Sequence, residues 1–258
     1  MDIIDAVILG LFQGLTEFIP VSSSGHLILA DQWLGLDSTF EFDVLLNIGT
    51  ILALLWYFRG RITGLARSAL GEQKSLASGL IIATLPTLVI GGLFTDFFNQ
   101  DWIRSGPTVA STLIIVGVIM IWLERRDKSK RQLDAVKAAD GLSIGLTQVL
   151  ALVPGVSRSG VTIIAGRLRG FDYKSAAEFS FLLSIPILIG AVCRVLLSQT
   201  GQDLIAEHQT EFLVGNLVAF VSGLWAVAFM ISWLSKGGLR PFGWYRIALG
   251  LIVLIVSF

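Results

Sequence analysis

The sequence has 258 residues, of which 54% are hydrophobic and 15% charged, and its mean hydropathy is +0.77. Soluble domains carry about 25% charged residues, so this chain has too few to cover a surface that faces water. The formal net charge of zero gives no basis for nucleic-acid binding. The single cysteine excludes an internal disulfide framework and a metal site built from several thiolates. We therefore expect an integral membrane protein.

The first apolar region, residues 3–33, is interrupted by polar residues and a proline. Residues 1–58 contain no Lys or Arg, so the basic part of a cleavable signal peptide is missing and we expect none. The pattern predicts two short helices joined by a polar break. Polar, non-helical backbone at membrane depth must be surrounded by protein or by a wet cavity. We therefore interpret the region as a re-entrant hairpin, with a kinked full span as the alternative.

Longer apolar stretches follow, and a helix needs about 20 such residues to cross a hydrocarbon core of roughly 30 Å. Six stretches qualify, at about 40–58, 76–96, 106–124, 175–198, 211–235 and 241–258. A second interrupted region, 141–169, follows a charged loop at about 125–140 and predicts a second re-entrant hairpin. The expected fold is all-α, with six transmembrane helices and two re-entrant helical hairpins.

The basic residues indicate an orientation. They gather after the first and third stretches, before the fourth, and between the fifth and sixth. If the spans alternate, all these loops fall on one face, which the positive-inside rule assigns to the cytoplasm. Both chain termini are then expected on the outer side.

The two halves of the chain resemble each other at a fixed offset. Residues 22–25 (SSSG) match residues 157–160 (SRSG), 135 residues later, and the segments at 9–13 and 144–148 match at the same offset. We expect one membrane domain, 1–258, with repeat halves at about 1–124 and 141–258. Each half has an odd number of spans, so the second copy is inverted, and the polar tips of the two hairpins can meet near the midplane.

Ionisable side chains inside a membrane are costly and usually functional. The hairpins contain Glu17, His26 and Arg158, and Gln13 lies on the same helix face as Glu17. The hydroxyl-bearing and small residues at the two tips are Ser22, Ser23, Ser24, Gly25, Ser157, Ser159, Gly160 and Thr162. A nucleophile, an imidazole, a guanidinium and helix N-termini together favour phosphate binding and phosphoryl transfer. For Ser22, Ser24 and Ser159, helix–helix contact is the alternative role.

Two segments carry a resemblance to a known family. Residues 14–26 (GLTEFIPVSSSGH) and 154–162 (PGVSRSGVT) resemble the two signatures of the undecaprenyl-diphosphate phosphatase family, which is associated with bacitracin resistance. The similarity extends over residues 178–183 and the order of the spans. It implies hydrolysis of undecaprenyl diphosphate to the monophosphate and inorganic phosphate in the bacterial plasma membrane, which recycles the lipid carrier of cell-wall synthesis.

The resemblance also implies roles for individual residues. Ser23 matches the proposed nucleophile, His26 the essential histidine, Glu17 an acid of the first motif and Arg158 the phosphate-binding arginine. The expected cofactor is a divalent cation, Mg²⁺ or Ca²⁺, held largely by the diphosphate, with Glu17 and Gln13 as the protein ligands within reach. Either Ser23, with His26 as its base, or His26 itself could attack, and Ser23 is favoured.

The resemblance further implies a lipid substrate in an outward-facing site. Bacitracin would compete for that substrate rather than bind the protein, and a homodimer is one state that the sequence allows. The alternative function is a flippase for the lipid monophosphate, because inverted repeats with broken helices also serve transport. A membrane scaffold would leave the buried polar tips unexplained.

Overall fold

The computed structural model describes residues 1–36, 38–67, 74–98, 100–126 and 130–256, which are helical apart from loops and one isolated bridge. The first half forms α1 (Ile3–Phe18), α2 (Ser23–Leu34), α3 (Phe40–Leu45), α4 (Asn47–Tyr57), α5 (Arg59–Arg67), α6 (Lys74–Leu93), α7 (Thr95–Phe98) and α8 (Gly106–Arg126). The second half forms η1 (Leu133–Ala135), α9 (Ala138–Gln148), η2 (Val149–Leu152), α10 (Arg158–Leu168), α11 (Tyr173–Leu196), α12 (Gln199–Glu207), α13 (Gln209–Leu234) and α14 (Arg240–Val256).

The protein is a multi-pass membrane protein. Five described helical segments are long and apolar enough to cross a membrane: Phe40–Tyr57, Ser75–Leu93, Gly106–Glu124, Tyr173–Leu196 and Gln209–Leu234. They correspond to the first five predicted spans. The first comprises α3 and α4, which meet at Leu46. The sixth predicted span forms α14, which has 17 residues and ends before residues 257–258, outside the described part of the chain.

Both interrupted regions form two short helices joined by a break, as predicted. The first break separates α1 from α2, and the second separates η2 from α10. Each second helix is capped by a serine, Ser22 or Ser157, whose hydroxyl accepts a hydrogen bond from a backbone N–H of the first turn. Ser22 has φ 78° and Ser157 has φ 72°, the only positive values at non-glycine residues in the described chain. Such backbone costs about 1–3 kcal/mol and persists only where the surroundings enforce it.

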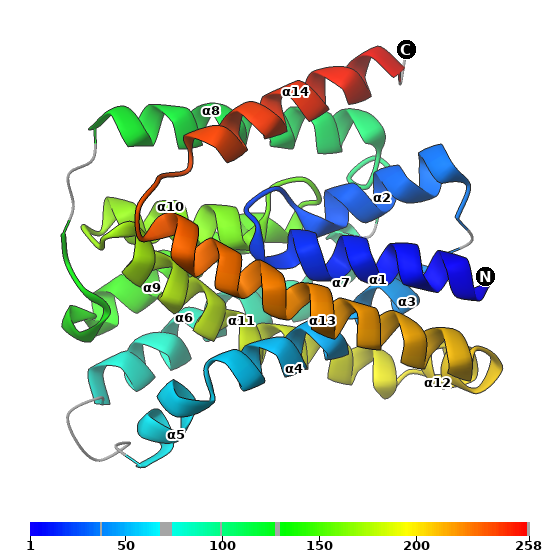
Figure 1. The fold of residues 1–258 in the computed structure, drawn as a ribbon, viewed down its shortest axis with the longest axis horizontal. Coiled ribbons are helices and arrows are strands. Elements are labelled where there is room, and N and C mark those ends of the chain that lie inside the picture. Colours follow the sequence, from blue (N-terminus) through cyan, green and yellow to red (C-terminus); the bar gives the residue numbers. More distant parts are fainter. Residues whose placement is uncertain (37, 68–73, 99, 127–129, 257–258) are drawn as a thin grey trace.

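The first helix of each interrupted region packs against a helix of the other half of the chain. α1 lies along α13, α9 lies along α6, and α8 and α14 run side by side (Figure 1). Small residues permit the close approach: a Cβ atom on Gly14 of α1 would lie 1.9 Å from Ser222 Oγ of α13. In membranes, where water does not drive helices together, such close packing holds them to each other.

The break between α1 and α2 lies near the middle of the molecule. The opposite ends of α1 and α2 lie at the end of the molecule that carries both chain termini (Figure 1). Gly25, in the first turn of α2, faces the second break, where a Cβ atom would lie 3.5 Å from Gly155 Cα. The chain thus brings the two polar breaks together in its interior.

Candidate active site

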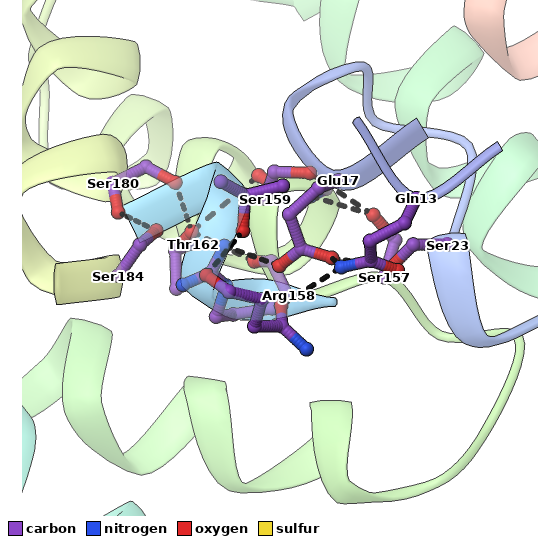
Figure 2. A network of polar contacts seen from close by, with 12 residues as sticks. Gln13, Glu17, Ser23, Ser157, Arg158, Ser159, Thr162, Ser180 and Ser184 are labelled. Carbon is purple, nitrogen blue, oxygen red and sulfur yellow. Dashed lines mark hydrogen bonds and ion pairs between the residues drawn. The ribbon is translucent and has the colours of Figure 1, made fainter. Parts of the chain in front are cut away.

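Glu17 is the centre of a buried polar network between the two breaks. The side chain is 8% exposed and projects from the last turn of α1. Its Oε2 atom accepts hydrogen bonds from Ser23 Oγ at 2.5 Å and from Gln13 Nε2 at 3.0 Å, and its Oε1 atom pairs with Arg158 Nη2 at 2.8 Å (Figure 2). Gln13 Nε2 also donates to Asn47 Oδ1 at 2.8 Å, which fixes the amide against α4. A hydroxyl from one tip and a guanidinium from the other therefore meet on one carboxylate.

Arg158 has unused hydrogen-bonding capacity inside the protein. Its side chain is 11% exposed, and only Nη2 contacts Glu17. The Nε and Nη1 atoms are buried and have no hydrogen-bond partner. Figure 2 shows one nitrogen of the guanidinium directed away from the other labelled side chains. Buried donors are rarely left without a partner, so these N–H groups mark a place for an acceptor such as a phosphate oxygen.

Hydrogen bonds of the hydroxyl-bearing residues fix the backbone of the second tip. Ser157 Oγ accepts from Gly160 N at 3.1 Å and lies 3.2 Å from Ser159 Oγ. Thr162 Oγ1 donates to the Arg158 carbonyl at 2.7 Å and lies 2.6 Å from Ser180 Oγ of α11, which anchors the first turn of α10. These contacts hold the backbone from which the guanidinium projects.

The first tip has the same construction. Ser22 Oγ accepts from Gly25 N at 3.3 Å and lies 3.4 Å from Ser24 Oγ. Ser22 is buried, Ser23 is half-buried and Ser24 is exposed. Of these three hydroxyls, only that of Ser23 reaches Glu17. The resemblance favours Ser23 among the three, and helix–helix contact is the alternative role of Ser22 and Ser24.

His26 lies beside the network but is bonded elsewhere. Its Nδ1 atom is 2.8 Å from the Ser22 carbonyl and its Nε2 atom is 2.8 Å from the Tyr245 hydroxyl. The imidazole and the Tyr245 ring are stacked, with an interplanar angle of 6°. Because a carbonyl only accepts, Nδ1 carries the proton and Nε2 accepts from the phenol. The Ser23 hydroxyl therefore has Glu17, rather than His26, as its acceptor.

Arg246 was missed by the sequence analysis. This side chain of α14 is fully buried. It donates from Nη1 to Pro20 O at 3.1 Å and from Nη2 to Gly155 O at 2.6 Å and Val156 O at 3.1 Å. An arginine inside an apolar stretch is itself a signal of function, and that signal could have identified it.

The donor set around Glu17 does not fit a metal ion held by the protein. Both carboxylate oxygens already accept hydrogen bonds, and Gln13 turns its NH₂ group toward Glu17. Within the described ranges, no group of three or more His, Cys, Asp or Glu residues could hold a metal. The arrangement instead offers a nucleophile, an adjacent base and a cation for a phosphate, as phosphoryl transfer requires.

Comparison with known proteins agrees with this chemistry. The family described as "Bacitracin resistance protein BacA" matches residues 6–252. Proteins named "Undecaprenyl-diphosphatase" are similar along nearly their whole length. That of Bordetella pertussis is 37% identical over 98% of this chain and 96% of its own. That of Carboxydothermus hydrogenoformans is 41% identical over 100% of this chain and 98% of its own. The chain belongs to the bacitracin resistance protein BacA family.

Proposed function

We propose that the chain hydrolyses undecaprenyl diphosphate to undecaprenyl phosphate and inorganic phosphate. One observation carries this proposal beyond the family's name: Arg158 holds two buried, unpartnered nitrogen atoms and pairs with Glu17, the same carboxylate that accepts from the Ser23 hydroxyl. The guanidinium would bind the terminal phosphate through these donors while Nη2 keeps its contact with Glu17. The relatives named "Undecaprenyl-diphosphatase" support the choice of substrate.

In the first step, Ser23 Oγ attacks the terminal phosphorus. The hydroxyl proton passes to Glu17 Oε2, which already accepts the Ser23 hydrogen bond. The bond between phosphorus and the bridging oxygen breaks, and undecaprenyl phosphate leaves with the proton that Glu17 received. The Arg158 guanidinium stabilises the charge that develops on the phosphoryl oxygens.

In the second step, water attacks the phosphoserine. Glu17 takes a proton from the water, the bond between phosphorus and Ser23 Oγ breaks, and the serine oxygen recovers the proton from Glu17. Inorganic phosphate is released and both side chains return to their starting states. His26 positions the first tip through its bonds to Ser22 and Tyr245.

We propose that any divalent cation arrives bound to the diphosphate. Mg²⁺ usually keeps several waters and binds substrate phosphates rather than an all-protein cage. This agrees with a site whose carboxylate, Glu17, already contacts Ser23, Gln13 and Arg158. Neither step above depends on a ligand bond between the ion and the protein.

We also infer that the two halves form an inverted repeat with re-entrant hairpins. The equivalent caps at Ser22 and Ser157 support this, as does the reciprocal packing of α1 on α13 and of α9 on α6. With the basic loops in the cytoplasm, the first hairpin enters from outside. The diphosphate would then be reached from the outer side, and the prenyl tail would stay in the lipid.

Purified protein incubated with undecaprenyl diphosphate and Mg²⁺ tests the proposal through released inorganic phosphate. We expect release by the native chain and a loss of about 10³-fold or more in Ser23→Ala, because the nucleophile is gone. Ser78→Ala is the matched control, since this half-buried hydroxyl donates to the Ser75 carbonyl within α6. Acid quenching followed by peptide mapping should place phosphate on Ser23. Phosphate on His26, or no release by a folded sample, contradicts the proposal.

A further inference from the structure

Arg246 connects the two breaks. Its Nη1 atom donates to Pro20 O in the first break, and its Nη2 atom donates to Gly155 O and Val156 O in the second. Its Nε atom lies 3.4 Å from Leu113 O of α8. Among the described residues, no ion pair joins Arg246 to a carboxylate. The only acceptors recorded for this buried cation are backbone carbonyls.

These carbonyls need a donor. A break in a helix leaves backbone acceptors without intrahelical partners, and at membrane depth there is no bulk water to satisfy them. Pro20 and Val156 are buried residues that lie two positions before the strained cap Ser22 and directly before the strained cap Ser157. Arg presents several N–H groups in one rigid plane, so a single side chain can serve both loops.

We propose that Arg246 is a positioning residue that holds the two tips in register. Ser23 follows the first loop that Arg246 contacts and Arg158 follows the second, and both must reach the same carboxylate of Glu17. By fixing Pro20 relative to Gly155, Arg246 sets the separation at which they do so. Its hydrogen bonds go to the carbonyls of Leu113, Pro20, Gly155 and Val156, so it acts on Ser23 and Arg158 through the loops.

This role rests on the proposed function, and kinetics measure it. Replacing Arg246 by Met removes every donor, and replacing it by Lys keeps the charge but loses the planar donor set. Misplacement of reacting groups by about 1 Å can cost about 10²-fold in rate. We expect kcat/KM to fall by about 10²-fold in Arg246→Met and about 10-fold in Arg246→Lys.

Arg167→Lys is the matched control. Arg167 is also buried and donates to a carbonyl, Phe171 O, but it lies at the opposite end of α10 from the break. We expect its kcat/KM to stay within about 3-fold of the native value, because it lies in the last turn of α10, away from the break. A loss in Arg167→Lys equal to that in Arg246→Lys would mean that general stability is responsible and would overturn the proposal.

A double-mutant cycle separates positioning from a merely structural effect. In an Arg158→Lys background the guanidinium is already absent, so adding Arg246→Lys should cost less than about 3-fold further. If the losses of the two single variants multiply in the double variant, Arg246 acts independently of the second tip and the proposal is contradicted. Native kcat/KM in both Arg246 variants would also refute the proposed role.

A spin-label measurement keeps this role testable if the proposed function fails. The only native cysteine, Cys193, is replaced by Ser, and labels are placed at the half-buried positions Ile19 and Val153 of the two breaks. We expect the dipolar broadening to weaken in Arg246→Lys and to be unchanged in Arg167→Lys. If the native chain releases no phosphate, the proposed function is wrong, but the positioning role of Arg246 is still tested by the broadening. Unchanged broadening in Arg246→Lys overturns the positioning role.

Discussion

The two tips of the molecule use the same backbone for different chemistry. Ser22 and Ser157 cap their helices at nearly the same φ, and each accepts from the glycine three residues later. The following residue differs: it is Ser23 in one tip and Arg158 in the other, and both side chains end on Glu17. The difference teaches that two tips with the same cap can bring a hydroxyl and a guanidinium to one carboxylate, because they differ at the first helical position.

The helices that precede the tips differ as well. Gln13 and Gln148 occupy matching positions, but Glu17 in α1 has Leu152 as its counterpart. Gln13 donates to Glu17 and to Asn47, whereas Gln148 donates to Thr87 and its Oε1 atom lacks a partner. The carboxylate of the network thus comes from the first half and the guanidinium from the second, so the network needs both halves.

After the loss of the Ser23 nucleophile, the largest expected effect comes from removing the residue that distinguishes the second tip. Arg158→Ala should lower kcat/KM for undecaprenyl diphosphate by about 10²- to 10³-fold, because a cation aimed at the phosphoryl oxygens is lost. Arg158→Lys should recover part of this loss, since lysine keeps the charge but not the planar donor set. Steady-state phosphate release measures both. Activity within about 3-fold of native in Arg158→Ala would remove the guanidinium from the mechanism.

A smaller effect separates the matched glutamines. Gln13→Leu should reduce kcat about 10-fold, because Glu17 loses the amide that orients its carboxylate. Gln148→Leu should leave kcat within about 3-fold of native and should not lower the unfolding temperature, since it also removes an unpartnered buried oxygen. Parallel assays of the two variants test the comparison. Equal losses in both would show that the halves share the chemistry.

Substitution of the strained cap residues should change stability in the same order at both tips. At Ser22 and at Ser157, Ala loses the cap and keeps the unfavourable φ, whereas Gly loses the cap but tolerates the φ. We expect each Ala variant to be less stable than the corresponding Gly variant by about 1 kcal/mol. Thermal unfolding in detergent measures the order. The reverse order at either site would show that φ is not enforced there.

A comparison away from the candidate site concerns the helix starts, where Asp5 and Asp140 accept from equivalent backbone N–H groups. Burial raises the pKa of Asp140, but hydrogen bonds from Arg131 and Arg169 and from the Lys137 backbone outweigh it, so the pKa is lowered from 3.8. A lowered pKa contributes stability above the ordinary value that is lost as pH falls through the lowered one.

We therefore expect the unfolding temperature of the native chain to fall as the pH drops below the ordinary pKa of Asp140. Asp140→Asn should flatten that decline and cost about 1–3 kcal/mol near neutral pH, because two half-exposed arginines lose their partner. Asp5→Asn, at the matched start of α1, should cost less than about 1 kcal/mol. An unchanged pH profile in Asp140→Asn would contradict this account.

The sequence predicted the elements better than the contacts between them. Hydropathy and length located the five described spans, and the interruptions at Pro20 and Pro154 located both breaks, because these signals are local. The assembly of Ser23, Glu17 and Arg158 followed only from matching the two halves. The pairing of His26 with Tyr245 depends on how α14 packs against the first tip, and no spacing in the chain encodes that distance.

The close packing of α1 on α13 limits how the molecule can move. At Gly10 and Gly14 there is no space for even one methyl group against α13, so the two helices cannot slide past each other without losing contact along their whole seam. Any rearrangement that exposed the site to the opposite leaflet would have to carry α1 and α13 as one rigid body. The hinges of such a motion would then lie in the connecting loops of the chain, away from this seam.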